Sequence, residues 1–410
     1  MTREIKKMNP GNIADHRFGP KKEPVVFSRR KAIRKGAAVL LGAGGFLAGE
    51  ARARQRPLEL DSSYIYCCPE LIEVTEPGPL VLADGTSQCS WSRRPYLELN
   101  LEDADFWPVR YFQRFRLKKW DMYHMTTPDH YISLLVAWIG YGAFCSAYVY
   151  DRRKREGMDD MHIRPPRPEL NMMRDSTFGL TEYKSAKVKA TFDVKGERRK
   201  IKLSFPKFAD IGLRADIELF LPSDHESICG AHLTNPRRMH YGHKINCMTA
   251  QGEMRLGNET FYLDPKDSFG ALDFGRGFYP PKLFWYWATA SGRDARGKLI
   301  GWNLGHGNSP LETAENAVFY DGRLHKIGVT RCRPPEDDFM KPWRVWTDDK
   351  SLDLKFIPEN VRINQLDLGY LYTTGRPALG AFSGHLTLDS GEVIEVSDLF
   401  GLYEWVDQRW

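Results

Sequence analysis

The 410-residue sequence predicts an all-β fold of antiparallel strands. From residue 130 onward, apolar and polar residues alternate with a period of two, which is the period of a half-buried strand. Turn-forming residues interrupt this alternation at short intervals. No stretch alternates strands with helices as a parallel sheet requires, so an antiparallel sandwich or barrel is expected.

The expected strands are joined by turns that can be read from the sequence. Asp321-Gly322 is typical of a type I′ hairpin, whose two central residues both have positive φ angles. Few helices are expected, and the best candidate is the C-terminal segment 397–410, with Ser397 as its N-cap. The expected turns lie at 140–142, 195–196, 257–258, 321–322 and 389–391.

Residues 1–53 hold most of the positive charge and resemble an export signal. They carry 12 Lys/Arg and 4 Asp/Glu, a local +8 that leaves −2 of the total +6 for the rest of the chain. Arg29 and Arg30 precede the 13-residue apolar run 37–49, and residues 51–53 offer a small-x-small cleavage site. The pattern resembles a twin-arginine signal, although Ala32 stands where the usual motif has Phe. We expect the twin-arginine translocase as a partner and a periplasmic or extracellular location.

Several function classes find no support in the sequence. The nearly neutral body lacks a basic stripe interleaved with aromatics, so no nucleic-acid partner is expected. The run 37–49 is too short to cross roughly 30 Å of hydrocarbon, and no stable membrane span is expected in the mature protein. His240 and His243, with Cys247 nearby, lie three apart and would face opposite sides of a strand, so no metal is expected. No cofactor is expected either, and Cys145 is predicted to be a buried free thiol.

The stretch 271–292, ALDFGRGFYPPKLFWYWATASG, raises the main functional question. Trp285 and Trp287 fall on one face of a strand, and the residues between them on the other. One face is expected in a core, while the other either packs as well or lines a ligand pocket. Asp273 is a candidate catalytic acid, or else it clamps Arg276 in a tight turn. Arg276 is also a candidate ligand-binding residue.

Other polar residues with candidate roles lie on either side of the indole pair. Glu315 is a second candidate catalytic acid. Tyr279, Asn303 and Asn316 are candidate ligand-binding residues. A polar group within a β framework is costly unless it is paired or wet, so the two asparagines are interpreted either as pocket residues or as hydrogen-bonded loop anchors.

The order of the motifs resembles domain-of-unknown-function family 2804. The resemblance spans about residues 85–410, and implies two lobes like those of two-lobed lipocalin-like proteins, a group that includes carotenoid hydratases and tocopherol cyclase. The expected division is an export signal at 1–53, an extension at 54–84, a first β lobe at 85–245 and a second at 246–410. The matching motifs are WSRRPYLELNL (91–101), LKKWDMYHMTTPDHYISLLVA (117–137), DPKDSFGALDFGRGFYP (264–280), FWYWATASG (284–292), IGWNLGHG (300–307) and ENAVFYDGRLHKI (315–327).

The resemblance and the residues together suggest a function. A carboxylic acid among aromatics has a raised pKa and can protonate an alkene, an epoxide or a leaving group, while indole faces stabilise the developing cation. The expected function is therefore binding or transformation of a hydrophobic, isoprenoid-like or lipid-like small molecule, by acid-catalysed hydration or cyclisation. The alternatives are a carrier without chemistry, and a glycan-active or glycan-binding β protein.

Overall fold

The computed structural model describes residues 71–105, 110–165, 170–235, 238–307, 315–335 and 337–409. The expected export signal at 1–53 and the first part of the expected extension at 54–84 lie outside the described residues. Within the described ranges, no helix is long and apolar enough to span a membrane.

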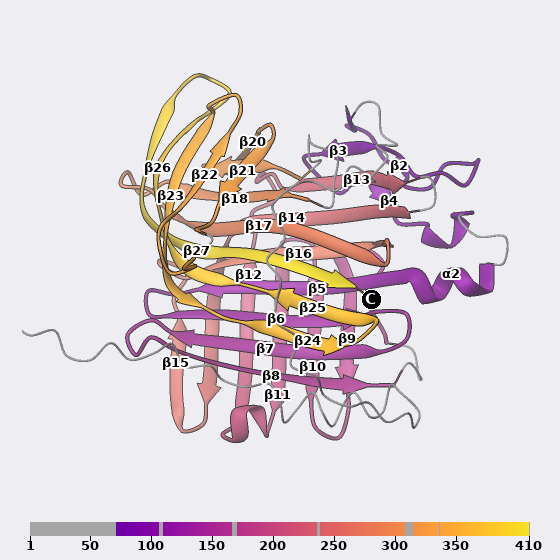
Figure 1. Ribbon diagram of the computed structural model, residues 1–410, viewed down its shortest axis with the longest axis horizontal. Helices are drawn as coiled ribbons and strands as arrows, with labels where there is room; N and C mark the ends of the chain where they lie inside the picture. Colours follow the sequence, from indigo (N-terminus) through magenta and orange to yellow (C-terminus); the bar gives the residue numbers. More distant parts are fainter. Residues whose placement is uncertain are drawn as a thin grey trace, which may run out of the picture.

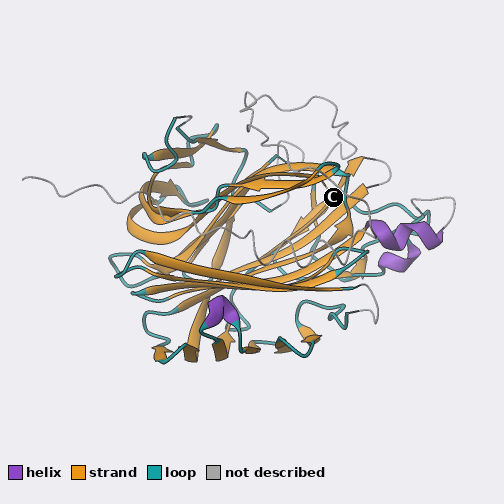
Figure 2. Cartoon of the chain, turned by 60° about the horizontal axis from the view of Figure 1, so that its bottom comes forward, coloured by secondary structure: helices purple, strands orange, loops and turns teal. Residues whose placement is uncertain are grey.

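Two large sheets, each curled into a half-barrel, form two lobes and confirm the all-β prediction (Figures 1 and 2). The first sheet follows the order β8-β7-β6-β5-β16-β14-β12-β11-β10-β9, with β1, β3, β13 and β15 beside this path. Its strands are β1 (Ile72–Glu73), β3 (Ser90–Ser92), β5 (Leu117–Thr126), β6 (His130–Trp138), β7 (Ala143–Asp151), β8 (Glu156–Arg164), β9 (Phe178–Lys184), β10 (Lys189–Lys195), β11 (Arg198–Phe205), β12 (Leu213–Phe220), β13 (Ile228–Asn235), β14 (Arg238–Leu256), β15 (Glu259–Leu263) and β16 (Phe269–Phe278).

The second sheet follows the order β20-β19-β18-β17-β27-β26-β23-β22-β21, with β24 and β25 beside it. Its strands are β17 (Lys282–Arg293), β18 (Leu299–His306), β19 (Ala317–Tyr320), β20 (Arg323–Lys326), β21 (Thr330–Arg333), β22 (Trp343–Thr347), β23 (Leu352–Val361), β24 (Asn364–Leu368), β25 (Leu371–Gly375), β26 (Ala378–Thr387) and β27 (Val393–Arg409). The remaining described elements are β2 (Gly78–Pro79) paired with β4 (Leu97–Glu98), the helix α2 (Arg110–Arg116), and the 3-10 helices η1 (Leu101–Asp103) and η2 (Phe208–Asp210).

The predicted hairpin turns are present where the sequence places them. Asp321 and Gly322 have φ angles of 49° and 82°, and join β19 to β20 as a type I′ turn requires. The segment 140–142 joins β6 to β7, and Gly196, with φ of 60°, joins β10 to β11. Gly has no Cβ, so it adopts such angles without strain.

The predicted C-terminal helix is wrong, because residues 397–409 belong to strand β27. This strand pairs with β17 on one side and with β26 on the other. Its apolar residues are buried within the second sheet, and these long-range contacts override the local helical appearance of the segment. A register irregularity beside Asp398, whose φ is 50°, disturbs the simple alternation that would have signalled a strand.

The change from one sheet to the other lies at residues 279–281, later than the expected division at 245/246. Strand β14 runs continuously through that division and pairs with β12 and β16 of the first sheet. Because β16 lies between β14 and β5, residues 269–278 complete the first lobe and not the second.

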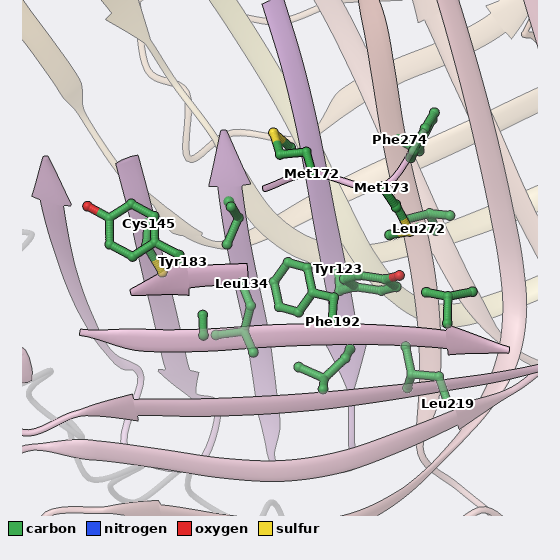
Figure 3. Close-up of a cluster of buried hydrophobic side chains, with 14 of the residues drawn as sticks. Tyr123, Leu134, Cys145, Met172, Met173, Tyr183, Phe192, Leu219, Leu272 and Phe274 are labelled. Carbon is green, nitrogen blue, oxygen red and sulfur yellow. The ribbon is translucent and has the colours of Figure 1, made fainter. Parts of the chain in front are cut away.

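Each lobe has its own apolar core, and a smaller cluster joins the two. Tyr123, Phe192 and Leu272 belong to the first core, shown in Figure 3. Cys145 lies in this core as a buried free thiol, which confirms that prediction. Tyr286 lies in the second core, whereas Trp287 packs with residues of β6, β7, β26 and β27. The predicted alternation in β17 is therefore confirmed: one face is core and the other faces the first lobe.

Candidate active site

A buried ion pair lies at the centre of the face that the first sheet turns towards the second. Lys244 of β14 and Asp273 of β16 are directly opposite each other in the antiparallel ladder, and their side chains form a salt bridge. The indole Nε1 of Trp120, on β5, donates to Asp273 Oδ1 at 2.9 Å. Register alone places these groups together, because side chains opposite each other on one face are neighbours.

Glu315 adds a second carboxylate to the pair. Its Oε2 lies 3.6 Å from Lys244 Nζ, and its Oε1 lies 2.7 Å from His240 Nε2. The other ring nitrogen of His240 is hydrogen-bonded to the Tyr279 hydroxyl. Glu315 immediately precedes β19, so the second lobe supplies this carboxylate to a lysine of the first lobe.

Two glycines opposite each other make room for this arrangement. Gly242 pairs with Gly275 between Lys244 and His240. A Cβ on Gly242 would lie 1.7 Å from Glu315 Oε1, and a Cβ on Gly275 would lie 2.1 Å from the Trp120 ring. Both contacts are far below the van der Waals limit, so any side chain at either position would displace a member of the cluster.

The second lobe provides the opposite wall. Trp285 and Trp287 project from β17, and Glu404 of β27 is the ladder partner of Trp287. Trp285 Nε1 donates to Glu404 Oε1 at 2.8 Å, and Trp287 Nε1 donates to Asn303 Oδ1 at 2.7 Å. Asn303 in turn donates from Nδ2 to the Glu315 backbone carbonyl at 2.8 Å, which links the indole wall to the carboxylate.

Aromatic contacts join the two walls. Lys244 Nζ lies 5.6 Å from the Trp287 ring centroid, a cation–π distance, and the His124 ring lies 5.1 Å from the same indole. The Trp120 and Tyr279 rings are 5.3 Å apart on the first-lobe side. We call this cluster the inter-lobe site; its members are Trp120, His124, His240, Lys244, Asp273, Tyr279, Trp285, Trp287, Asn303, Glu315 and Glu404.

Three carboxyl and amino groups of this site have shifted pKa values, and the directions of the shifts differ. Burial by itself raises the pKa of Glu315, but Lys244 and His240 outweigh it and hold the pKa at about 2. Burial lowers the pKa of Lys244, but Asp273 and Glu315 reverse this and leave it above its usual value. Burial raises the pKa of Glu404 to about 7; the hydrogen bond from Trp285 lowers it, and Asp273 raises it further. Near neutral pH, Glu315 is therefore ionised, Lys244 is charged and Glu404 is poised to give or take a proton.

The imidazoles of His124 and His232 add no positive charge. Burial lowers the pKa of His124 to about 4 and that of His232, which contacts His240, to about 3. One ammonium thus faces the ionised Glu315, the carboxylate of Asp273 and the titrating Glu404. The carboxylates around Lys244 and the nearby indole faces can stabilise a positive charge that develops during a reaction.

Some acidic and basic side chains of the site keep part of their surface exposed. The side chains of Asp273 and Glu315 are 14% and 16% exposed, and that of His240 is 11% exposed. Lys244, in contrast, is 6% exposed and lies beneath them. In the described part of the chain, no three His, Cys, Asp or Glu residues are grouped to hold a metal ion.

Six sequence-predicted residues lie in the inter-lobe site, and two do not. The six are Asp273, Tyr279, Trp285, Trp287, Asn303 and Glu315. Arg276 projects into the first lobe, and Asn316 accepts from Gly305 N and donates to the Gly328 carbonyl as a loop anchor. The expected Asp273–Arg276 clamp is wrong, because residues three apart on a strand face opposite sides. Arg276 instead pairs with Asp121 at 2.7 Å.

Sequence reasoning missed five site residues, namely Trp120, His124, His240, Lys244 and Glu404. His240 and His243 do point to opposite faces: His243 contacts Ser176 and Ser227 inside the first lobe. The same alternation places Lys244 beside His240 on the outer face. Lys244 could therefore have been predicted as a site residue from the sequence. Glu404 was not predicted as a site residue because its segment was expected to form a helix.

The family model for a domain of unknown function, DUF2804, matches residues 71–410. The chain belongs to this family. None of the curated proteins compared matches the DUF2804 chain. Among solved structures it is similar to a putative AttH from Nitrosomonas europaea, with 11% identity, a TM-score of 0.42, and coverage of 71% of this chain and 92% of that one. It is also similar to kievitone hydratase from Nectria haematococca, with 10% identity, a TM-score of 0.39, and coverage of 72% and 88%. At these TM-scores neither likeness bears on function.

Proposed function

We propose that the inter-lobe site is the active site of a proton-transfer enzyme that hydrates, or in reverse dehydrates, a hydrophobic small molecule. The observation that carries the proposal is the position of Glu404. Its carboxyl group lies among indoles, next to a cluster of ion-paired carboxylates that solvent can reach. A carboxyl in such surroundings is an acid near neutral pH, which is what protonation of a double bond requires.

Glu404 would act first as the acid and then as the base. Its proton is transferred to one carbon of the double bond, and the neighbouring carbon becomes cationic. A water molecule adds to that carbon, and one of its protons returns to the Glu404 carboxylate. The alkene and one water give one alcohol, and Glu404 recovers its starting state, so no further reactant is needed.

The charge and the walls of the site suit the cationic state. Glu315 is ionised, and its carboxylate and that of Asp273 both lie beside Lys244, where they can attract a developing cation. The faces of Trp285 and Trp287 offer additional stabilisation, because the electron-rich face of an indole attracts cations. The apolar residues beside them, including Tyr131 and Phe400, favour a substrate that is itself apolar.

The test is isotope incorporation from labelled water. Isoprenoid alkenes and the corresponding tertiary alcohols are incubated with the pure protein in ¹⁸O-water and analysed by mass spectrometry. We expect ¹⁸O-labelled alcohol with the wild-type protein, and at least a hundredfold less with Glu404→Gln, since one positioned proton donor typically contributes 10²–10⁴-fold. Glu395→Gln changes an exposed carboxylate on the same strand and should behave as the wild type.

Two results would count against the proposal. Equal label incorporation by Glu404→Gln and the wild type would remove Glu404 as the acid. Binding of the alkenes by both proteins without any incorporation would favour a carrier. The pH profile separates the roles further: wild-type activity should depend on a group titrating near pH 7, and this dependence should vanish in the Gln variant.

A further inference from the structure

Residues 110–119, RYFQRFRLKK, form a short segment that is both basic and aromatic. The segment carries five Arg/Lys side chains and no Asp or Glu, although the body of the chain is nearly neutral. Its first seven residues form α2, and the last three begin β5. The segment is a local exception to the expected absence of basic residues interleaved with aromatics. It is therefore a candidate contact surface for an anionic partner.

Helix α2 projects at the margin of the molecule and is anchored along one side (Figures 1 and 2). Gln113 is 5% exposed, and its Nε2 donates to the Ala104 carbonyl at 2.9 Å. Lys118, 2% exposed, lies just beyond the helix, and its Nζ donates to the carbonyls of Phe115 and Ile139. These bonds fix the helix to the body of the first lobe and leave its other side towards solvent.

The solvent side of α2 combines two phenylalanines with guanidinium groups. Phe112 and Phe115 are 58% and 37% exposed, and residues three apart on a helix are neighbours on its surface. Arg114 is exposed, with its guanidinium 4.9 Å from the Phe115 ring centroid, and Arg116 is partly exposed. A single exposed apolar residue is ordinary, but two aromatic rings beside cations on one projecting helix are typical of a contact with a lipid–water interface.

A cavity of about 290 Å³ lies beside the same helix. Gln113, Arg114 and Leu117 contribute to its lining, and the exposure of Arg114 shows that the cavity meets the surface next to the phenylalanines. Apolar space bordered by positive charge complements a partner that is apolar inside and negative at its surface. The other lining residues are Leu99, Leu101, Glu102, Lys119, Met172, Met173, Arg174, Arg276 and Phe278.

The shape of this surface distinguishes between two anionic partners. A single-stranded nucleic acid is held in a groove that follows its backbone. Helix α2 projects outward instead, so it suits a partner with a broad surface (Figure 1). Aromatic rings at the level of the head groups, with basic side chains beside them, are the usual means by which proteins bind to a bilayer surface.

We propose that α2 docks the protein on the surface of a bilayer that contains anionic phospholipids. Phe112 and Phe115 insert at the level of the head groups, while Arg114 and Arg116 pair with lipid phosphates. The docking is peripheral, because a helix of seven residues is about 10 Å long and cannot cross the hydrocarbon. This surface is separate from the inter-lobe site, and the proposal does not depend on the chemistry there.

Vesicle sedimentation with the full-length protein tests the proposal. Vesicles of phosphatidylcholine alone are compared with vesicles that also contain phosphatidylglycerol. We expect binding to the anionic vesicles to be at least about tenfold stronger, and high salt to remove most of the difference, because salt screens exposed charges. The pair Arg114→Gln and Arg116→Gln should weaken this binding at least about tenfold, since each basic residue near an anionic surface contributes about fivefold. The pair Phe112→Ser and Phe115→Ser should weaken it to a similar extent.

Two matched controls change similar groups elsewhere on the molecule. Tyr262→Ser removes an aromatic side chain that is 72% exposed on β15. The pair Lys200→Gln and Lys202→Gln removes two exposed cations from β11, and so changes the net charge as much as the arginine pair does. Both controls should bind anionic vesicles as the wild type does.

Hydrogen–deuterium exchange locates the contact, which matters because residues 1–53 carry a charge of +8 of their own. We expect the backbone amides of residues 110–119 to exchange more slowly when anionic vesicles are present. Slower exchange confined to residues 1–53, equal binding to both kinds of vesicle, or unchanged binding by both paired α2 variants would overturn the proposal. Slower exchange at 110–119 with a single-stranded oligonucleotide but not with vesicles would overturn it as well, and would assign the segment to nucleic acid.

Discussion

Replacing Lys244 by methionine should destabilise the protein most at neutral pH. The substitution keeps the length of the side chain but leaves Asp273 and Glu315 without their shared cation. The pKa of Glu315 is lowered from 4.5 to about 2, and a shift of roughly 2.5 units corresponds to about 3 kcal/mol of stability. Removal of one partner from a buried ion pair costs about 3–5 kcal/mol in general, which agrees with this figure.

The loss of stability in Lys244→Met should change with pH in a definite direction. A carboxyl whose pKa is lowered on folding contributes stability above its unfolded pKa, near 4.5, and loses it as the pH falls through about 2. The deficit of Lys244→Met should therefore be greatest from pH 5 to 7 and shrink below pH 4.5. Below about pH 2 the wild type keeps a buried ammonium among neutral acids, so the Met variant should become the more stable protein.

Urea unfolding followed by tryptophan fluorescence measures these differences. Lys202→Met is the matched control, because Lys202 pairs with Asp216 at 3.1 Å on the surface, where its side chain is 53% exposed. Exposed pairs contribute about 0–1 kcal/mol, so this variant should differ little from the wild type. A deficit for Lys244→Met below about 1 kcal/mol at pH 7, or one that is the same at pH 7 and pH 3, would refute the reasoning.

Two further predictions concern the glycine pair and the N-terminus. Gly242→Ala should expel Glu315 from its place beside His240, because the new Cβ would lie 1.7 Å from Glu315 Oε1. Thermal melts should show a loss of stability of about 1–3 kcal/mol. Gly78→Ala, where no atom lies nearer than 3.9 Å to the new Cβ, is the control, and equal melting of the two variants would contradict the prediction. Replacing both Arg29 and Arg30 by Lys should block export of the full chain in a fractionation assay, and unchanged export would show that residues 1–53 are not a twin-arginine signal.

The sequence determined the fold class because its signals are local. Period-two alternation needs only neighbouring residues, and Asp321-Gly322 adopts its turn through its own backbone preferences. The opposite orientations of Trp287 and Tyr286, and of His240 and His243, follow from the same alternation. Six of the eight predicted site residues lie in the inter-lobe site, and they belong to motifs that the sequence had already singled out.

Tertiary structure decided what depends on register between distant strands. Lys244 meets Asp273 because β14 and β16 pair at one register, and Glu315 joins them only because the second lobe packs against the first. The assignment of residues 397–409 to a strand required β17 and β26 on either side, which no local pattern supplies. The pKa values follow the same rule: Glu315 and Glu404 are chemically alike, but Lys244 and His240 offset the effect of burial on Glu315, whereas burial dominates at Glu404, and their pKa values lie about 5 units apart.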